Sequence, residues 1–176
     1  MHFVILSQYY KPESNSPAVR LPILARELIK NCHSVEVVTA LPNYPIGKIF
    51  EGYQKRIYMK EEMDGVNVHR VWIYPALGTG IKRILNYLSF VVFMLFGLFQ
   101  TKKADYLFIN SPPLLLGLTG YFYARICHTP IIFHVADLWP DFPVNAGILR
   151  NPIIIVTIQA ICAKKSVKNL IKFQNA

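Results

Sequence analysis

The sequence contains few acidic residues and few cysteines. Only 10 residues are Asp or Glu, against 19 Lys and Arg in a chain of 176, so the formal net charge is +9. A surplus of this size predicts an anionic partner, and nucleic acid, an acidic membrane surface and a phosphate-bearing small molecule all qualify. The three cysteines are too few and too unevenly spaced for a disulfide framework, which predicts a reducing compartment.

Several motifs that would identify a ligand are also absent. No G-x-G-x-x-G or P-loop pattern follows the first apolar run. Because no RNP, helix-turn-helix or zinc pattern occurs, no nucleic-acid partner is predicted. The pairs Cys32-His33 and Cys127-His128 have no C-x-x-C or H-E-x-x-H spacing, so no metal site is predicted. The amino terminus has no basic region, which favours a buried strand over a signal peptide.

Charged residues are missing from one long segment. Residues 84–101 carry no formal charge, and two basic pairs, Lys82-Arg83 and Lys102-Lys103, flank them. Three interpretations are a transmembrane helix, a helix buried against a sheet, and a helix in the membrane interface with its basic neighbours on lipid phosphates. A helix in an alternating chain must also cover the sheet, so we favour the second and third interpretations together.

What the sequence does contain is an alternation of short apolar runs and helical patterns. Strands are predicted at residues 2–7, 34–39, 105–110 and 130–135, a hairpin at 56–75 with its turn at Asp64-Gly65, and helices at 84–101, 111–127 and 151–165. Buried strands that alternate with helices predict an α/β domain, doubly wound around a mainly parallel sheet.

A further helix follows the loop after the first strand, and its start has two interpretations. Its predicted buried face consists of apolar residues at helical spacing, namely Leu21, Leu24, Ala25 and Leu28. Ser16 can cap this helix with Pro17 at the first helical position. Alternatively, Pro22 marks the start after a longer loop, because proline is unfavourable inside a helix.

Three polar stretches follow predicted strands. They are the loop after Ser7, the "NSPP" turn after Ile109 and "ADLWPD" after Val135. Ligands of doubly wound sheets bind beyond the carboxyl ends of the strands, so these stretches are candidate sites. In the first of them, helix-start N–H groups with Arg20 or Lys11 favour a phosphate group, and an ordinary connection between strand and helix is the alternative.

Asp137 is the strongest candidate for chemistry. It follows a buried strand, stands near Trp139 and has a second carboxylate at Asp141. A carboxylate in a partly apolar cleft can have a raised pKa and act as a base, whereas Asp is also common as a helix cap or turn residue. His134 lies inside the strand run and is expected to be a core or rim histidine.

The order of these motifs resembles the N-terminal domain of family 4 glycosyltransferases. The resemblance rests on "QYYKPESNSPAVR", "PNYPIGK", "LNYLSF", "NSPPLLLGL" and "DLWPD", and it covers about residues 1–149. It is nearest to bacterial enzymes that build surface polysaccharide, such as colanic-acid-type and fucosamine-type transferases. Similar proteins usually have glycine where Cys32 stands, which suits the end of a helix. They often have Asp and Arg in place of His134 and Ala136.

The resemblance implies a GT-B architecture, in which two Rossmann-like domains face a cleft. It implies that residues 1–150 form the N-terminal domain and receive the acceptor, whereas a C-terminal domain binds the nucleotide-sugar donor. Transfer in this family retains the anomeric configuration and generally needs no metal or other cofactor. Acceptors are commonly sugars linked to polyprenyl diphosphate at the inner membrane face. A cytoplasmic protein, peripheral to the inner face of the cell membrane, is therefore expected.

By the same resemblance, Asp137 is the expected catalytic residue. The expected substrate-binding residues are Ser16, Arg20, Asn43, Tyr44, Ser111, His134 and Trp139. In a complete enzyme, Asp137 would lie at the cleft near the acceptor hydroxyl or the donor sugar.

Acidic residues end early in the chain. None follows Asp141, so residues 151–176 are expected to form a basic helix or tail, and the donor domain is expected to be absent. The chain is then expected not to transfer sugar alone, with a separate donor-domain chain as a possible partner. Two alternatives remain open: a non-catalytic module that binds lipid-linked glycan or an anionic membrane, and a single-span membrane protein.

Overall fold

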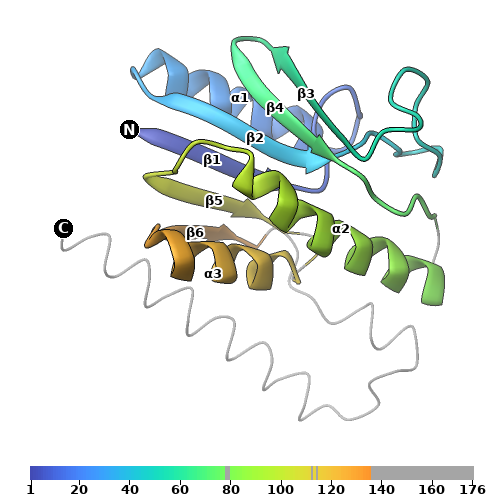
Figure 1. Cartoon of the computed structure of the whole chain (residues 1–176). Coiled ribbons are helices and arrows are strands. Elements are labelled where there is room, and N and C mark those ends of the chain that lie inside the picture. The colour runs from blue at the N-terminus through green and yellow to red at the C-terminus, as the bar shows by residue number, and fades with distance from the viewer. Residues whose placement is uncertain (78–79, 112, 114, 136–176) are drawn as a thin grey trace. The chain divides into compact units, whose positions relative to one another are not determined.

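A six-stranded sheet forms the core of residues 1–135 (Figure 1). The computed structural model describes residues 1–77, 80–111, 113 and 115–135. The strands are β1 (His2–Ser7), β2 (Ser34–Ala40), β3 (Tyr58–Met63), β4 (Val66–Val71), β5 (Tyr106–Asn110) and β6 (Ile131–His134). The predictions for Asp137, Trp139 and a helix at 151–165 lie outside the described residues.

The strand order confirms the predicted fold class. The order across the sheet is β3-β4-β2-β1-β5-β6, and every neighbouring pair is parallel except the β3–β4 hairpin. The chain builds outward from β1 to β2 and β4, then returns to place β5 on the other side of β1. This reversal at β1 and β5 is the topological switch point at which α/β sheets of the Rossmann-like kind open a crevice.

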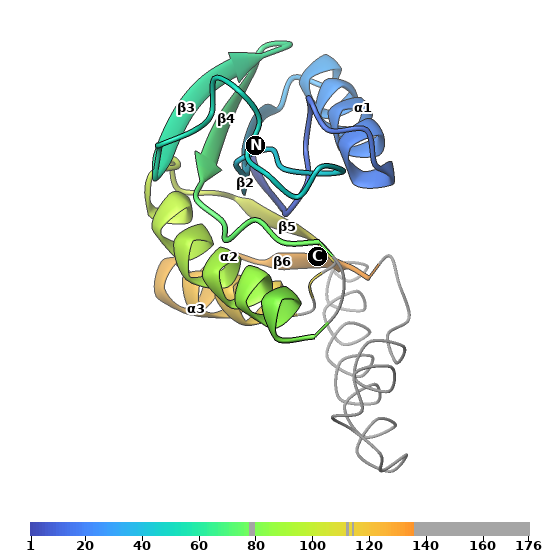
Figure 2. The same cartoon turned by 90° about the vertical axis from the view of Figure 1, so that its right-hand side faces the viewer.

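Helices cover both faces of the sheet. The helix α1 (Ser16–Lys30) packs on one face, and α2 (Ile81–Phe99) and α3 (Leu116–Cys127) pack on the other (Figure 2). The alternation along β1 explains the two layers, since Ile5 belongs to the apolar cluster under α1 whereas Val4 and Leu6 belong to the cluster under α2 and α3. Successive side chains of a strand point to opposite faces, so continuous apolar runs are required here.

Most of the uncharged segment belongs to α2, which starts at Ile81 and so includes Lys82 and Arg83, and α2 covers the sheet. By length and composition alone it could cross a membrane, with a mean hydropathy of 1.6. However, β4 before it and β5 after it belong to the same sheet, so both ends of α2 lie on one side of any bilayer. Gly97 lets the helix approach closely, because a Cβ there would lie 2.6 Å from Val71 Cγ1 and 2.7 Å from Val38 Cγ1. The structure therefore supports the covering helix and not the single span.

The start of α1 differs by one residue from the prediction. Asn15 is the N-cap, and its side-chain oxygen accepts a hydrogen bond from the Ala18 N–H at 3.2 Å. Ser16 is the first helical residue instead, so its prediction as the cap is wrong. Both residue types accept such a bond equally well, which is why spacing alone does not separate them. Pro22 lies inside the helix, buried on the face toward the sheet.

The end of α1 explains why glycine suits the position of Cys32. Cys32 adopts a left-handed backbone conformation with φ of 60°. Its N–H donates to the Ile29 carbonyl at 3.0 Å and the His33 N–H donates to the Leu28 carbonyl at 3.1 Å. These two bonds define a Schellman motif, whose left-handed position usually carries glycine. The predicted hairpin turn is likewise confirmed, with positive φ at Asp64 and Gly65.

Candidate functional site

The carboxyl ends of the parallel strands meet at one edge of the sheet, and three predicted site residues gather there. Arg20, from α1, donates from Nη2 to Asn110 Oδ1 at 3.3 Å at the end of β5. The Ser111 N–H donates to the His134 carbonyl at 3.0 Å. Arg20, Ser111 and His134 therefore surround the switch point, whereas Ser16 is exposed at the start of α1.

Two polar atoms at this switch point have no hydrogen-bond partner among the described residues. One is Oγ of the fully buried Ser111, and the other is Nδ1 of half-buried His134. The His134 ring stacks on Phe108 with centroids 6.1 Å apart. A buried hydroxyl or imidazole without a partner costs free energy, so such atoms point to a place where a ligand completes the hydrogen bonds.

Glu13 holds the "PNYP" loop at the same edge. Its Oε1 accepts the N–H of Asn43 at 2.9 Å and the N–H of Tyr44 at 2.8 Å. Burial raises the pKa of this carboxyl group, and the two backbone N–H groups oppose the rise. Sequence reasoning missed Glu13, because a single Glu in a polar loop gives no local signal of contacts with residues about 30 positions away.

Arg70 fixes the loop after β1. Its guanidinium is fully buried in β4, pairs with Glu61 and donates to the Lys11 carbonyl. Its Cζ lies 5.1 Å from the centre of the Tyr53 ring. Lys11, a candidate phosphate contact, itself pairs with Asp64 at 2.7 Å. Of the two cations named for this loop, Arg20 is thus the one without a carboxylate partner among the described residues.

A second polar group connects the loop after β1 to α2. Gln8 donates from Nε2 to Asn86 Oδ1 at 3.0 Å, and Asn86 donates to the Tyr74 carbonyl at 2.6 Å. In the first turn of α2, Arg83 donates from Nε to the Tyr87 hydroxyl at 2.8 Å. The side chain of Tyr9 also interacts electrostatically with Arg83. One interpretation of the sequence places Arg83 on lipid phosphates, and the structure adds its contacts with Tyr87 and Tyr9.

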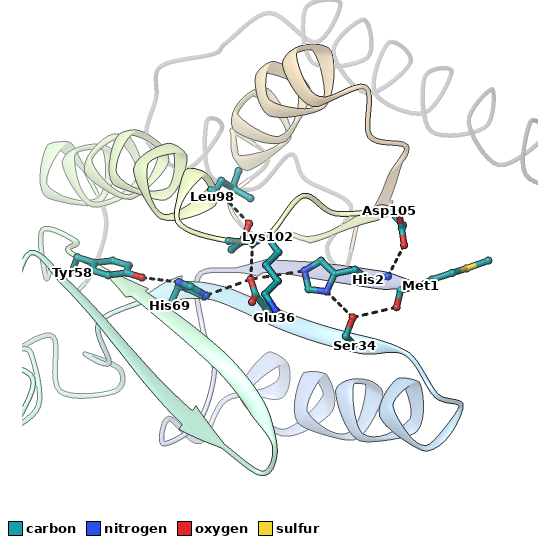
Figure 3. Close-up of polar contacts among 10 residues, drawn as sticks. Met1, His2, Ser34, Glu36, Tyr58, His69, Leu98, Lys102 and Asp105 are labelled. Carbon is teal, nitrogen blue, oxygen red and sulfur yellow. Dashed lines mark hydrogen bonds and ion pairs between the residues drawn. The ribbon is translucent and has the colours of Figure 1, made fainter.

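The opposite edge of the sheet carries a separate polar cluster (Figure 3). Glu36 is buried, and its Oε2 lies 3.5 Å from His69 Nε2, 3.8 Å from His2 Nε2 and 3.1 Å from the Lys102 N–H. His69 Nδ1 lies 2.7 Å from the Tyr58 hydroxyl. Because these contacts tie the connection between α2 and β5 to the amino ends of the strands, we interpret the cluster as structural.

Burial lowers the pKa of His69 below its usual 6.5, although Glu36 opposes the shift. As the pH falls through 6.5, His69 binds a proton in the unfolded chain but remains neutral in the folded chain. The free energy of unfolding should therefore decrease as the pH falls. We expect urea unfolding to show a smaller loss of stability between about pH 7.5 and 5.5 in His69→Gln than in the wild type. The exposed His128→Gln is the control. Equal losses in all three proteins would contradict this account.

The described residues contain no group of three or more His, Cys, Asp and Glu side chains that could hold a metal ion. The Cys32-His33 pair directly follows the cap of α1, and the Cys127-His128 pair forms the end of α3.

Comparison with known proteins adds three findings. Residues 17–152 match the model of the glycosyl transferase 4-like domain. A protein of Escherichia coli K12 named as a colanic acid biosynthesis glycosyl transferase, WcaI, is 26% identical over 151 residues, covering 84% of this chain and 37% of that protein. A structure described as trehalose-6-phosphate from E. coli bound with UDP-2-fluoro glucose is 12% identical with a TM-score of 0.49, covering 76% of this chain and 32% of that one. The chain thus spans about a third of the length of these proteins.

Proposed function

The chain belongs to the glycosyl transferase 4-like domain family, in agreement with the resemblance of its motifs, and from this premise we propose that it is the acceptor-binding half of a sugar transferase. The observation that carries the proposal is the switch point between β1 and β5. A buried hydroxyl, an imidazole and an arginine converge there, at the edge where sheets of this topology bind ligands. The product would be a glycan of surface polysaccharide, as the name of the WcaI relative suggests.

Each predicted residue has a proposed role. Arg20 and Ser111 would contact the acceptor beside His134, and the "PNYP" loop with Asn43 and Tyr44 would border the same edge. Ser16, exposed at the start of α1, and Trp139 are proposed as further contacts. Asp137, three positions beyond the end of β6 in sequence, is the proposed catalytic carboxylate. We propose transfer with retention of configuration and without a metal ion.

The proposed donor is a nucleotide-sugar, and a second half is proposed to bind it. The match covers 37% of the relative WcaI. The rest of that protein's length leaves room for a donor-binding half. The second half would be a further part of the same protein or a separate chain. The 176-residue chain alone, mixed with labelled UDP-sugars and a lipid-linked acceptor, is therefore expected to give no transfer. Robust turnover by this chain would contradict the proposal that a second half binds the donor.

The proposed acceptor is linked to a lipid diphosphate, and the proposed location is the inner face of the cell membrane. Two helices on one face of the sheet support this location with exposed apolar side chains. These are Ile81, Leu85, Leu88, Val92, Phe96 and Phe99 on α2, and Leu118, Tyr121, Phe122 and Ile126 on α3. We call them the apolar helix face. A soluble surface rarely carries so many large apolar groups on adjacent helices, which supports an interaction site on this face.

The two helices lie side by side, and basic residues adjoin them. Thr119 Oγ1 donates to the Val91 carbonyl at 3.2 Å, and the rings of Phe99 and Tyr123 are 5.8 Å apart. Four exposed basic residues belong to these helices or follow them in sequence: Lys82 in α2, Lys102 and Lys103 after α2, and Arg125 in α3. Apolar side chains bordered by cations are complementary to the acyl boundary and phosphates of an anionic bilayer. The bilayer is therefore the proposed partner of this face.

Vesicle binding tests the location. Val92→Glu introduces a charge at the centre of the apolar helix face and is expected to weaken binding to anionic vesicles about tenfold or more. The matched control is Ile23→Glu, which changes an exposed apolar residue of α1 on the other face of the sheet. Equal binding by both variants would contradict the proposal. Dimerisation without lipid that Val92→Glu abolishes would instead assign this face to a second copy of the chain.

A further inference from the structure

We propose that Arg83, held between Tyr9 and Tyr87, is the binding site for a phosphate or diphosphate group of the ligand. This inference deepens the proposed function and rests on it, because a diphosphate joins sugar and lipid in the proposed acceptor. The site is distinct from the contacts that Arg20 and Ser111 make at the ends of β5 and β6. It adds Arg83, for which the sequence indicates only a contact with the membrane surface.

The two tyrosines hold the Arg83 side chain in place. Nε donates to the Tyr87 hydroxyl at 2.8 Å, and Cζ lies 4.7 Å from the centre of the same ring. Tyr9 also interacts electrostatically with the guanidinium. Both rings are only 7% exposed. A guanidinium has five N–H groups, so donors remain after Nε is used, and their fork matches the geometry of phosphate oxygens.

The positive charge of Arg83 has no carboxylate partner among the described residues. Arg70, Lys11 and Lys30 each pair with an Asp or Glu side chain, whereas Arg83 does not. Glu13, which acts electrostatically on Tyr9, accepts two backbone N–H groups instead. A half-buried cation without a counter-ion is stabilised by an anionic ligand, because part of its hydration is already lost.

The surroundings favour an anion at the same place. Arg83 stands in the first turn of α2, and the N-cap Gly80 provides no side-chain acceptor for the N–H groups at the positive end of the helix. One turn further, Asn86 bonds Gln8, which directly follows β1 at the carboxyl edge. Gln8 is 1% exposed and its Oε1 has no partner in the described part of the chain, so a ligand hydroxyl would complete its hydrogen bonds.

The test is a calorimetric titration of the full chain with inorganic pyrophosphate at constant ionic strength. Arg83→Gln is expected to weaken pyrophosphate binding about ten- to hundredfold, because it removes a charge-assisted pair of hydrogen bonds. Lys82→Gln removes the same charge from the exposed neighbour and is expected to change the affinity about twofold or less. Equal weakening in both variants, or no binding by the wild type, would overturn the proposal.

Two further measurements keep the outcome unambiguous. Arg83→Lys retains the charge without the planar fork, so it should bind pyrophosphate with intermediate affinity even if the glutamine variant fails to fold. Anionic vesicles separate the two sources of phosphate. If Arg83→Gln loses vesicle binding and keeps its pyrophosphate affinity, Arg83 contacts lipid headgroups and the proposal is wrong. Intact pyrophosphate binding at Arg83 with no affinity for a lipid-linked sugar would support this site and refute the proposed acceptor.

Discussion

Replacing Arg70 with alanine is expected to lower the free energy of unfolding by about 3–5 kcal/mol. The side chain is fully buried, and the substitution leaves the carboxylate of Glu61 without its cation. It also removes the donors to the Lys11 and Ala40 carbonyls and the contact with the Tyr53 ring. Removing one partner of a buried pair costs more than the pair contributes, because the remaining groups stay desolvated.

Urea unfolding of the full chain measures this loss. Arg125→Ala is the matched control, because Arg125 is exposed on α3, and it should change stability by about 0.5 kcal/mol or less. The double variant Arg70→Met with Glu61→Gln fills the volume with an apolar side chain and removes the unpaired carboxylate. It should therefore be more stable than Arg70→Ala. A decrease below about 1 kcal/mol for Arg70→Ala would contradict the assigned role.

Glu13→Ala is expected to destabilise the chain by about 2–4 kcal/mol, because the N–H groups of Asn43 and Tyr44 lose their shared acceptor. The "PNYP" loop should then leave the carboxyl edge, so hydrogen exchange of these two amides should accelerate more than exchange in β1. Glu13→Gln keeps one acceptor oxygen and should fall between the wild type and the alanine variant.

The control for Glu13 is Glu27→Ala. Glu27 is an exposed carboxylate that pairs with Lys30 one turn along α1, at 2.7 Å. Such a surface pair contributes about 0.5 kcal/mol or less, so this variant should resemble the wild type. Protected Asn43 and Tyr44 amides in Glu13→Ala would show that the loop is held by other contacts.

Local patterns predict most of this fold. The apolar run of β1, the Asp64-Gly65 turn and the long apolar stretch of α2 each carry their own signal, because strand periodicity, turn chemistry and helix composition are short-range properties. The exact cap of α1 is not predictable in this way. Asn15 and Ser16 both have a side-chain acceptor, and packing decides between them.

The site is less predictable than the fold. The switch point follows from strand order, so Arg20 and Ser111 are reachable from the sequence and the family resemblance. Glu13, Arg70 and Arg83 are not, because each acts through contacts that depend on tertiary packing. A charge in a loop or at a helix start looks solvated until the structure shows what surrounds it.

The most direct test of the central claim is a calorimetric titration of the 176-residue chain with two ligands. One is a sugar diphosphate that carries a short, water-soluble prenyl chain, and the other is UDP-glucose. The account predicts saturable binding of the prenyl-linked sugar, weakened about tenfold in Arg20→Ala, and no measurable binding of UDP-glucose. UDP-glucose binding as tight as that of the prenyl-linked sugar would contradict the assignment of this chain to the acceptor side.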